Sequence, residues 1–348
     1  MTEAAPPPSR TGLWIRIGAS LVLAGLIVYA LQPYLDAVPR DLSVDGPGLA
    51  TFAALLVLYL VVRSGRWVFL VRPLGPAPVG TVIKVGLAGT MWIALLPFRL
   101  GELARPVLLA KTTGIDVRKG LGTVALERVC DGLMVGGLFF ATMGDANDDG
   151  VATLRAATTG VMALFVFALV TLLVMARWPA FASRLIDATV GRVAPRLGEF
   201  ASNLASGVSE GMAALPRGGP LLAFLAATAV YWAINAIAMW VLAGACGLGL
   251  SLSQVVSVMA VMNIALLVPG GPAQLGVFQG GVALGLSLFL PQHLVHDRGS
   301  TFVFYLYLGQ LLAICAAGVL SQRSLRVSWT GPWWSASDPT PDPPPPSP

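Results

Sequence analysis

Charged residues are scarce in this chain of 348 residues. Lys, Arg, Asp and Glu make up 11% of it, against about 25% in a typical soluble domain. Hydrophobic residues make up 56%, and the mean hydropathy is +0.77. Because so little polar surface could face water, a soluble enzyme, a disordered chain and a nucleic-acid-binding protein are poor interpretations, despite a pI near 9.4. The composition indicates an integral membrane protein with no nucleic-acid partner.

Residues that form disulfides or hold metals are also few. Cys130, Cys246 and Cys315 lie far apart in apolar runs, and an odd number of cysteines gives no disulfide framework. His293 and His296 are three residues apart, but no clustered Cys or paired carboxylate accompanies them. The sequence contains no phosphate-binding loop and no nucleophile elbow. We therefore predict no metal, no cofactor and no catalytic residue.

Long apolar runs are abundant, and they predict an all-α polytopic membrane protein. A transmembrane helix needs about 20 mostly apolar residues, and six runs meet that length. Two further runs are interrupted, one by Pro97 and one by the Pro-Gly-Gly-Pro sequence at 269–272. The six full runs are 12–31, 48–71, 120–143, 151–176, 220–246 and 301–320, and the broken runs are 79–96 and 252–290.

The ends of the chain differ from this central domain. Residues 1–11 and 326–348 are rich in proline, so we expect disordered tails around one membrane domain over 12–325. The run 12–31 could be a secretory signal peptide. It has no convincing cleavage site, and a retained first helix is the favoured interpretation.

The distribution of Lys and Arg predicts the orientation of the spans. Segment 63–84 holds four bases and no acid, and segment 98–119 holds five bases and two acids. These basic segments flank the same short run, 79–96. If that run crossed the membrane, one basic segment would lie outside the cell, so we expect it to enter and return on the cytoplasmic side. The acidic segments 32–47 and 144–150 then lie outside, and both termini are cytoplasmic.

The two broken runs share a short pattern, since Pro97-Phe-Arg-Leu-Gly101 matches Pro272-Ala-Gln-Leu-Gly276 at three positions. The second run is expected to enter from the outer face. Opposite entry with similar sequence favours an inverted repeat, which is common in transporters with a site between broken helices. The alternative is two kinked hairpins with chance similarity. The residues expected to form the turns are Pro97, Gly101, Pro269, Gly270, Gly271, Pro272 and Gly276.

A third feature is the segment 181–215, whose apolar residues recur with one-sided helical spacing. Arginines on it suit a helix lying in the plane of the cytoplasmic membrane surface. A soluble cap packed on the spans remains an equal alternative.

The charged residues that lie near or within the spans form one cluster in the sequence. Glu102 and Arg105 follow the first broken run, and Glu127, Arg128 and Asp131 lie within the run 120–143. Each helical residue advances by about 100°, so the last three face one direction. Charges inside a membrane usually face a protein interior or a wet cavity and pair with one another. The cluster is either a cavity for a charged lipid headgroup or a self-neutralising ion network that pins the broken element.

In the first case, the turn 97–101 would direct a helix N-terminus at an anionic headgroup. Arg99 and Arg105 would then contact phosphate, while Glu127 and Asp131 would orient them or bind a cationic headgroup. The predicted substrate-binding residues are Arg99, Glu102, Arg105, Glu127, Arg128 and Asp131.

Four motifs together resemble a known family, the lysylphosphatidylglycerol synthase transmembrane region, or flippase-like membrane proteins. They are Arg63-x-x-Arg66-Trp67, Leu96-Pro97-x-Arg99-x-Gly101-Glu102, Glu127-Arg128-x-x-Asp131 and the late Pro-Gly-Gly-x-x-x-Leu-Gly. The resemblance covers most of 12–325. It implies a polytopic module that moves aminoacylated or other polar-headed lipids between leaflets.

Two departures qualify this resemblance. Only a proline-rich tail follows residue 325, where larger synthases carry a soluble aminoacyl-transferase domain, so we do not expect this chain alone to aminoacylate lipid. Gln279 stands where the family often has Glu, which weakens any role of a carboxylate there.

Three functions fit these observations, and the expected partners are membrane lipids with anionic or aminoacylated headgroups. The favoured one is a lipid carrier in the cytoplasmic membrane. The second is an enzyme acting on a phospholipid or polyprenyl-phosphate lipid, with Glu102, Glu127 and Asp131 as acid, base or metal-binding groups. The third is an accessory subunit for lipid-synthesis enzymes. The lipid, the direction of transport and the oligomeric state stay open.

Overall fold

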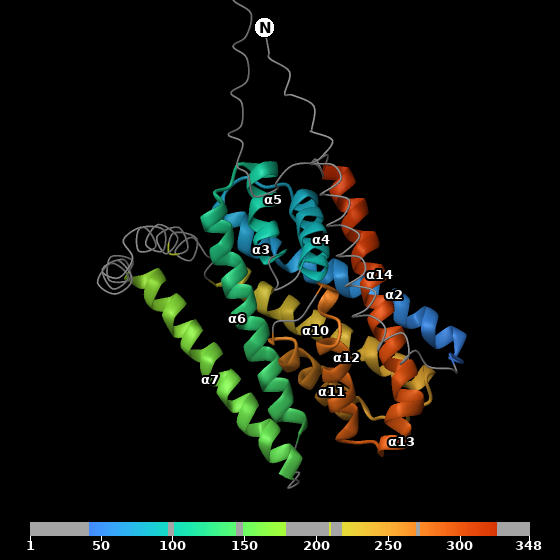
Figure 1. Cartoon of the computed structure of the whole chain (residues 1–348). Coiled ribbons are helices and arrows are strands. Elements are labelled where there is room, and N and C mark those ends of the chain that lie inside the picture. Colours follow the sequence, from blue (N-terminus) through green and yellow to red (C-terminus); the bar gives the residue numbers. More distant parts are fainter. Residues whose placement is uncertain are drawn as a thin grey trace, which may run out of the picture. The chain divides into compact units, whose positions relative to one another are not determined.

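The computed structural model describes residues 42–96, 101–143, 149–178, 209, 218–268 and 272–325. All regular structure within these ranges is helical (Figure 1), as the apolar runs predict. The expected run 12–31, both tails and the segment 181–215 apart from Ser209 lie outside the described residues, as do Pro97, Arg99 and the triplet 269–271. The helices are α2 (Gly46–Arg66), α3 (Val68–Val71), η1 (Arg72–Leu74), α4 (Val79–Leu95), α5 (Ala104–Thr113), α6 (Val117–Thr142), α7 (Asp149–Arg177), α10 (Gly219–Ala245), α11 (Leu252–Ala265), η3 (Pro272–Gln274), α12 (Val277–Ser287), α13 (Gln292–Leu294), η4 (Val295–Gly299) and α14 (Ser300–Leu325).

Four stretches have the length and hydropathy to cross a membrane, namely Gly46–Leu74, Ala152–Arg177, Gly219–Ala245 and Gln292–Leu325. Helix α6 has 26 residues, so it rises about 39 Å and is also long enough to span. It carries the charges that lower its hydropathy. The five expected full spans that fall within the described residues are therefore all helices of spanning length.

Several helices begin two or three residues before the apolar runs because short polar caps precede them. Asp45 precedes α2, and its carboxylate accepts a hydrogen bond from the Gly48 N–H at 2.7 Å. Asp116 does the same for α6, accepting from the Arg118 N–H at 2.7 Å. Such caps satisfy N–H groups that have no partner within the helix. The polar residues before each run thus set where the helix starts.

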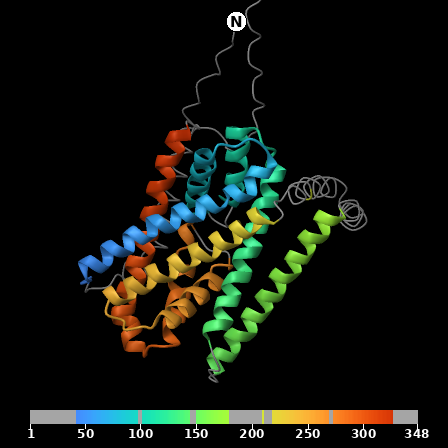
Figure 2. The ribbon, with the colours of Figure 1, turned by 180° about the vertical axis from the view of Figure 1, so that it is seen from behind.

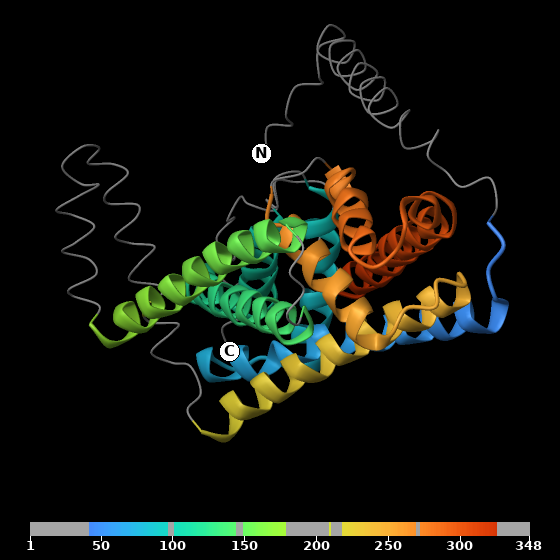
Figure 3. The same ribbon diagram turned by 90° about the horizontal axis from the view of Figure 1, so that it is seen from below.

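Helices α2 and α10 pack side by side, as Figures 2 and 3 show from two directions. Their close approach depends on a small residue, because a Cβ on Gly48 would lie 2.7 Å from the Cβ of Ala245. Helix α14 packs along α4 so closely that a Cβ added to Gly318 would lie 2.3 Å from the Cβ of Met91. Small residues at crossings are a common means of packing membrane helices, since lipid supplies no hydrophobic force between them.

The first broken run forms a hairpin, α4–α5, which packs on the start of α6. Helix α5 has 10 residues, so it rises only about 15 Å, half the thickness of a membrane core. At the tip, Gly101 packs on the backbone of Trp92, where an added Cβ would lie 2.2 Å from the carbonyl carbon and oxygen. The chain therefore turns back within one compact element, which supports the re-entrant interpretation.

The second broken run forms a hairpin of α11 and α12, with 14 and 11 residues. Gly285 lets the two helices of this hairpin pack closely, because an added Cβ would lie 2.9 Å from the Cα of Val258. Ser257 on α11 donates a hydrogen bond of 2.8 Å to Thr142 at the end of α6. The hairpins thus contact opposite ends of α6, and η3 at the second tip packs against α4. Entry from opposite faces requires this arrangement.

Helix α7 packs against α6 through one face, where the ring of Phe165 covers Gly132. The opposite face carries large apolar side chains, and Phe167 is 69% exposed. In a bilayer such a surface faces lipid, as expected for the predicted span 151–176.

Candidate functional site

A buried arginine at the end of α2 is the centre of an ion network. Arg66 is 1% exposed, and its Nη2 lies 2.9 Å from Glu127 Oε1 and 2.7 Å from Asp131 Oδ2. Its Nη1 also donates to Thr228 Oγ1 at 2.9 Å. The guanidinium lies over the ring of Tyr231, 4.3 Å from its centroid. Arg66, counted among the bases of segment 63–84, is thus the last residue of α2, and two carboxylates on α6 compensate its charge.

Arg105 at the start of α5 joins the hairpin to the same network. Its Nη1 lies 2.9 Å from Glu127 Oε2, and its guanidinium lies over the Trp67 ring at 4.3 Å. Gly89 makes room for the Arg105 side chain, since an added Cβ would lie 2.0 Å from its Cγ. The side chain of Glu127 is fully buried and thus held between Arg66 and Arg105. Paired charges of this kind offset the large desolvation cost of burial.

Arg128 and Asp131 extend the network by one helical turn. Arg128 Nη2 lies 3.0 Å from Glu127 Oε1 and 3.8 Å from Asp131 Oδ2, and its Nη1 lies 3.6 Å from Glu102 Oε1. Asp131 Oδ1 also accepts hydrogen bonds from the hydroxyl of Tyr231 and, at 3.3 Å, from the indole N–H of Trp232. The carboxylate thus has partners on α2, α6 and α10.

The structure brings together five of the six residues predicted for substrate binding, and the sixth, Arg99, lies outside the described residues. Sequence reasoning missed the centre of the network, although one signal was available. Within the apolar run 48–71, Arg63 and Arg66 have no acid on their own helix. Arginines in an apolar run require acidic partners, which therefore had to lie on another span. The five residues brought together are Glu102, Arg105, Glu127, Arg128 and Asp131.

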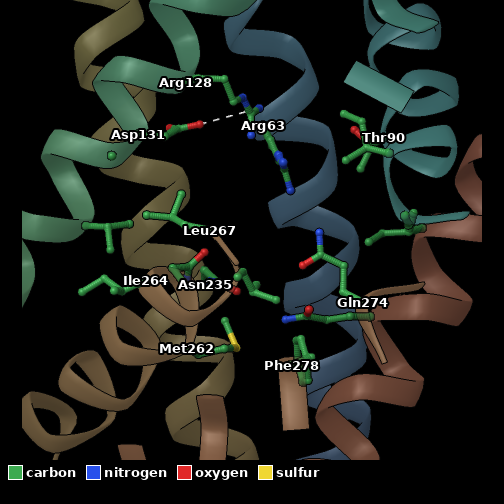
Figure 4. Close-up of a pocket in the computed structure, with 18 of the residues that line it drawn as sticks. Arg63, Thr90, Arg128, Asp131, Asn235, Met262, Ile264, Leu267, Gln274 and Phe278 are labelled. Atoms are coloured by element: carbon green, nitrogen blue, oxygen red, sulfur yellow. Dashed lines mark ion pairs between the residues drawn. The ribbon is translucent and has the colours of Figure 1, made fainter. Parts of the chain in front are cut away.

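A cavity of about 410 Å³ lies beside the network, between the tips of the two hairpins. Its charged end is formed by Arg63, Glu102, Arg128 and Asp131, of which three are labelled in Figure 4. Arg105 and Glu127 do not line the cavity, and their ion pairs hold the cavity-lining charges in position. The volume is within the range of small-molecule sites.

The other end of the cavity is lined by uncharged amides and aromatic rings. Asn235 and Gln274 face it (Figure 4), together with Asn263 and Gln310. Asn235 is 3% exposed, and its Oδ1 accepts no hydrogen bond within the described part of the chain; the same holds for the buried Oε1 of Gln274. The sequence reasoning did not identify these amides. Asn235 in the middle of an apolar run was the signal that could have done so.

The tip of the second hairpin has an unusual backbone. Ala273 and Gln274 both have φ of 55°, which side-chain-bearing residues rarely adopt. The hydroxyl of Tyr307 donates to the Ala273 carbonyl at 3.0 Å and fixes this turn. Such strain often occurs at functional sites and requires surrounding contacts to hold it. Pro272 and Gly276, predicted as turn residues, bracket this segment.

Gln279 has a structural contact in the same hairpin. Its side-chain oxygen accepts a hydrogen bond of 2.8 Å from the N–H of Gly276, whose φ is 84°. Either an amide or a carboxylate oxygen can accept this bond. A Gln at this position therefore supplies the acceptor that a Glu would also supply.

No group of three or more His, Cys, Asp or Glu side chains is placed to hold a metal ion in the described ranges. The three carboxylates of the network each face an arginine instead. The arrangement suits recognition of a charged group by ion pairs and hydrogen bonds.

The fold and the site define a class: a multi-pass helical membrane protein in which two broken helices enclose a polar cavity. Within this class, the chain belongs to the lysylphosphatidylglycerol synthase TM region family, whose model matches residues 13–309. This confirms the resemblance drawn from the four motifs. No curated protein and no solved structure matched the chain significantly. The family identifies it as a membrane protein of lipid metabolism or translocation.

Proposed function

We propose that the protein is a carrier that moves a polar-headed lipid between the leaflets of the cytoplasmic membrane. The observation that supports this best is the cavity between the two hairpin tips, with charged residues at one end and apolar walls along its sides. A headgroup crossing a bilayer must be shielded from hydrocarbon, because each bare charge there costs several kcal/mol. Carriers commonly provide such a site where discontinuous helices meet.

The site residues have two roles in this proposal. Glu102, Arg128 and Asp131 line the cavity and contact the headgroup, whereas Arg105 and Glu127 keep them in position. Arg99, which lies outside the described residues, is proposed from the sequence alone to add a further phosphate contact. The headgroups considered are anionic or aminoacylated. On the Lys and Arg distribution, both termini and the α4–α5 hairpin are placed on the cytoplasmic side.

A second candidate is an enzyme acting on the headgroup of a phospholipid or polyprenyl-phosphate lipid. Glu102 is the residue that favours it. Its carboxylate lines the cavity, lies 3.6 Å from Arg128, and accepts no hydrogen bond from the described residues. A carboxylate that lines the cavity and accepts no such hydrogen bond could exchange a proton with a substrate. An accessory role beside lipid-synthesis enzymes is the third candidate.

Reconstitution into liposomes with labelled native lipids tests these alternatives. A carrier equilibrates label between leaflets and leaves the lipid chemically unchanged. An enzyme produces a modified lipid that mass spectrometry detects. If the folded protein does neither, the carrier proposal fails and the accessory role gains support.

The variant that sharpens this experiment is Glu102→Gln, which removes a charge from the cavity wall and leaves the bonds around Glu127 in place. We expect exchange to slow by about tenfold with little change in melting temperature. The matched control is Arg118→Gln, which breaks the exposed pair with Asp116 far from the cavity. Equal exchange in both variants would remove Glu102 from the mechanism.

A further inference from the structure

The charges around the cavity do not balance. The network contains Arg66, Arg105 and Arg128 against Glu102, Glu127 and Asp131, so its six charges sum to zero. Arg63 adds a fourth arginine to the same region. It lines the cavity and donates a hydrogen bond of 2.9 Å to the hydroxyl of Tyr59. It makes no ion pair within 4.0 Å with a carboxylate of the described residues, so the described residues of the site carry one excess positive charge.

An excess charge of +1 is suited to a ligand with a single negative charge. A phosphodiester has this charge, and its two free oxygens match the planar donors of an arginine. Arg105, which the sequence suggested for this contact, is buried between Glu127 and Trp67 and does not line the cavity. Arg63 is therefore the described residue best placed to bind a phosphate.

The amide end of the cavity needs hydrogen-bond donors. Asn235 directs its amide nitrogen to the sulfur of Met259 at 3.2 Å, which leaves its oxygen to the cavity. Gln274 presents a second buried oxygen without a partner in the described structure. Buried acceptors of this kind are costly unless a ligand or water donates to them.

Two kinds of headgroup carry such donors, namely hydroxyls and ammonium groups, and the charge balance separates them. A phosphate at Arg63 brings the described residues of the site to neutrality. An ammonium group would then add a positive charge where each carboxylate of the network, Glu102 included, already faces an arginine, and an unpaired buried charge is strongly unfavourable. Uncharged hydroxyls satisfy the amide oxygens without that cost.

We propose that the cavity binds a lipid with one phosphodiester attached to an uncharged, hydroxyl-bearing headgroup, such as a polyol or a sugar. The phosphate contacts Arg63, and the hydroxyls donate to Asn235 and Gln274. The aromatic rings of Phe278 and Tyr307 form the apolar wall of the same end. This inference rests on the proposed carrier function and specifies its substrate class.

Lipids with identical acyl chains and different headgroups test it in liposomes containing the full chain. We expect phosphatidylglycerol and phosphatidylinositol to exchange at least tenfold faster than phosphatidylcholine and phosphatidylethanolamine. A neutral glycolipid without phosphate should also exchange slowly, because it leaves Arg63 unpaired. If the choline or ethanolamine lipid exchanges fastest, this inference is wrong while the carrier function stands.

Two variants assign the preference to its residues. Arg63→Gln should slow exchange of phosphatidylglycerol by about tenfold, and Arg63→Lys should restore part of it. Asn235→Leu should abolish the difference between polyol and choline lipids while the melting temperature stays equal or rises, because a buried unpaired oxygen is removed. A fall in melting temperature with an unchanged headgroup preference would make Asn235 purely structural and overturn the assignment. Arg118→Gln serves as the control.

If no lipid exchanges, the carrier function fails, and binding still tests the inference. The thermal stabilisation of detergent-purified protein by phosphatidylglycerol is then compared with that by phosphatidylcholine. A larger shift with phosphatidylglycerol that disappears in Arg63→Gln supports the site. Equal shifts with both lipids contradict it.

Discussion

The two hairpins share a sequence pattern, but they use different chemistry at their tips. The first is fixed by ion pairs, in which Arg105 and Glu102 face partners on α6. The second carries amides on a strained backbone, and Gln274 has no partner for its buried oxygen among the described residues. Charges in a membrane require partners, so ion pairs hold the first tip against α6. Neutral amides tolerate an unfilled bond at lower cost, so the second tip can offer it to a ligand.

The largest effect should come from the tip of the first hairpin. In Gly101→Ala the added Cβ would meet the Trp92 backbone at 2.2 Å, and backbone atoms cannot move aside as a flexible side chain can. We expect a loss of about 3 kcal/mol or more in stability and little monodisperse protein on size-exclusion chromatography. The control on the second hairpin is Gly280→Ala, where an added Cβ meets nothing within 4 Å and helix propensity should add about 0.5–1 kcal/mol. Equal yields of the two variants would contradict the structure of the first tip.

The next effect distinguishes the buried network from pairs on the surface. Arg66→Ala leaves Glu127 and Asp131 without their central partner and should cost about 3–5 kcal/mol. Arg118→Ala breaks an exposed pair and should change stability by at most about 1 kcal/mol. Chemical or thermal unfolding in detergent measures both. A small effect in Arg66→Ala would show that the carboxylates find other partners.

A smaller effect should come from the cap in the second hairpin. Gln279→Ala removes the acceptor for the Gly276 N–H, and loss of such a cap costs about 0.5–2 kcal/mol. Gln279→Glu should keep most of the stability, because a carboxylate oxygen can accept the same bond. Gln292→Ala, at an exposed position, is the control. If Gln279→Glu is as unstable as Gln279→Ala, the side-chain oxygen does not act as the cap.

The smallest effect concerns the start of α6, outside the membrane. Hydrogen bonds from Arg118 lower the pKa of Asp116 below its usual value, and the carboxylate also caps the helix. A carboxyl group whose pKa is lower in the folded state stabilises the protein at pH values above its pKa in the unfolded state. This stabilisation is lost as the pH falls through the pKa of the folded state. We expect a loss of at most about 1 kcal/mol on acidification, because the pair is exposed. Asp116→Asn should retain the cap and lose this contribution to the pH dependence of the melting temperature. An unchanged pH profile would exclude Asp116 as its source.

The sequence predicted the features that depend on composition and on the cost of charge in a membrane. Run length predicted the helices, and the requirement for pairing predicted that Glu127, Arg128 and Asp131 meet partners of opposite charge. It could not assign Arg66, because the choice between a cytoplasmic end and a buried pair depends on where α2 packs. Asn235 was missed for a related reason, since only the packing of the helices shows that this amide in an apolar run lines a cavity.

Helix α6 contacts both hairpins, through Glu127 near its middle and Thr142 at its end. Fifteen residues separate these two contacts, or about 22 Å along the axis at 1.5 Å per residue. An α-helix is stiff along its axis, so α6 links the two hairpins rigidly in that direction. We therefore expect an axial displacement of α6 to move its contacts at Glu127 and Thr142 together, and with them the two walls of the cavity.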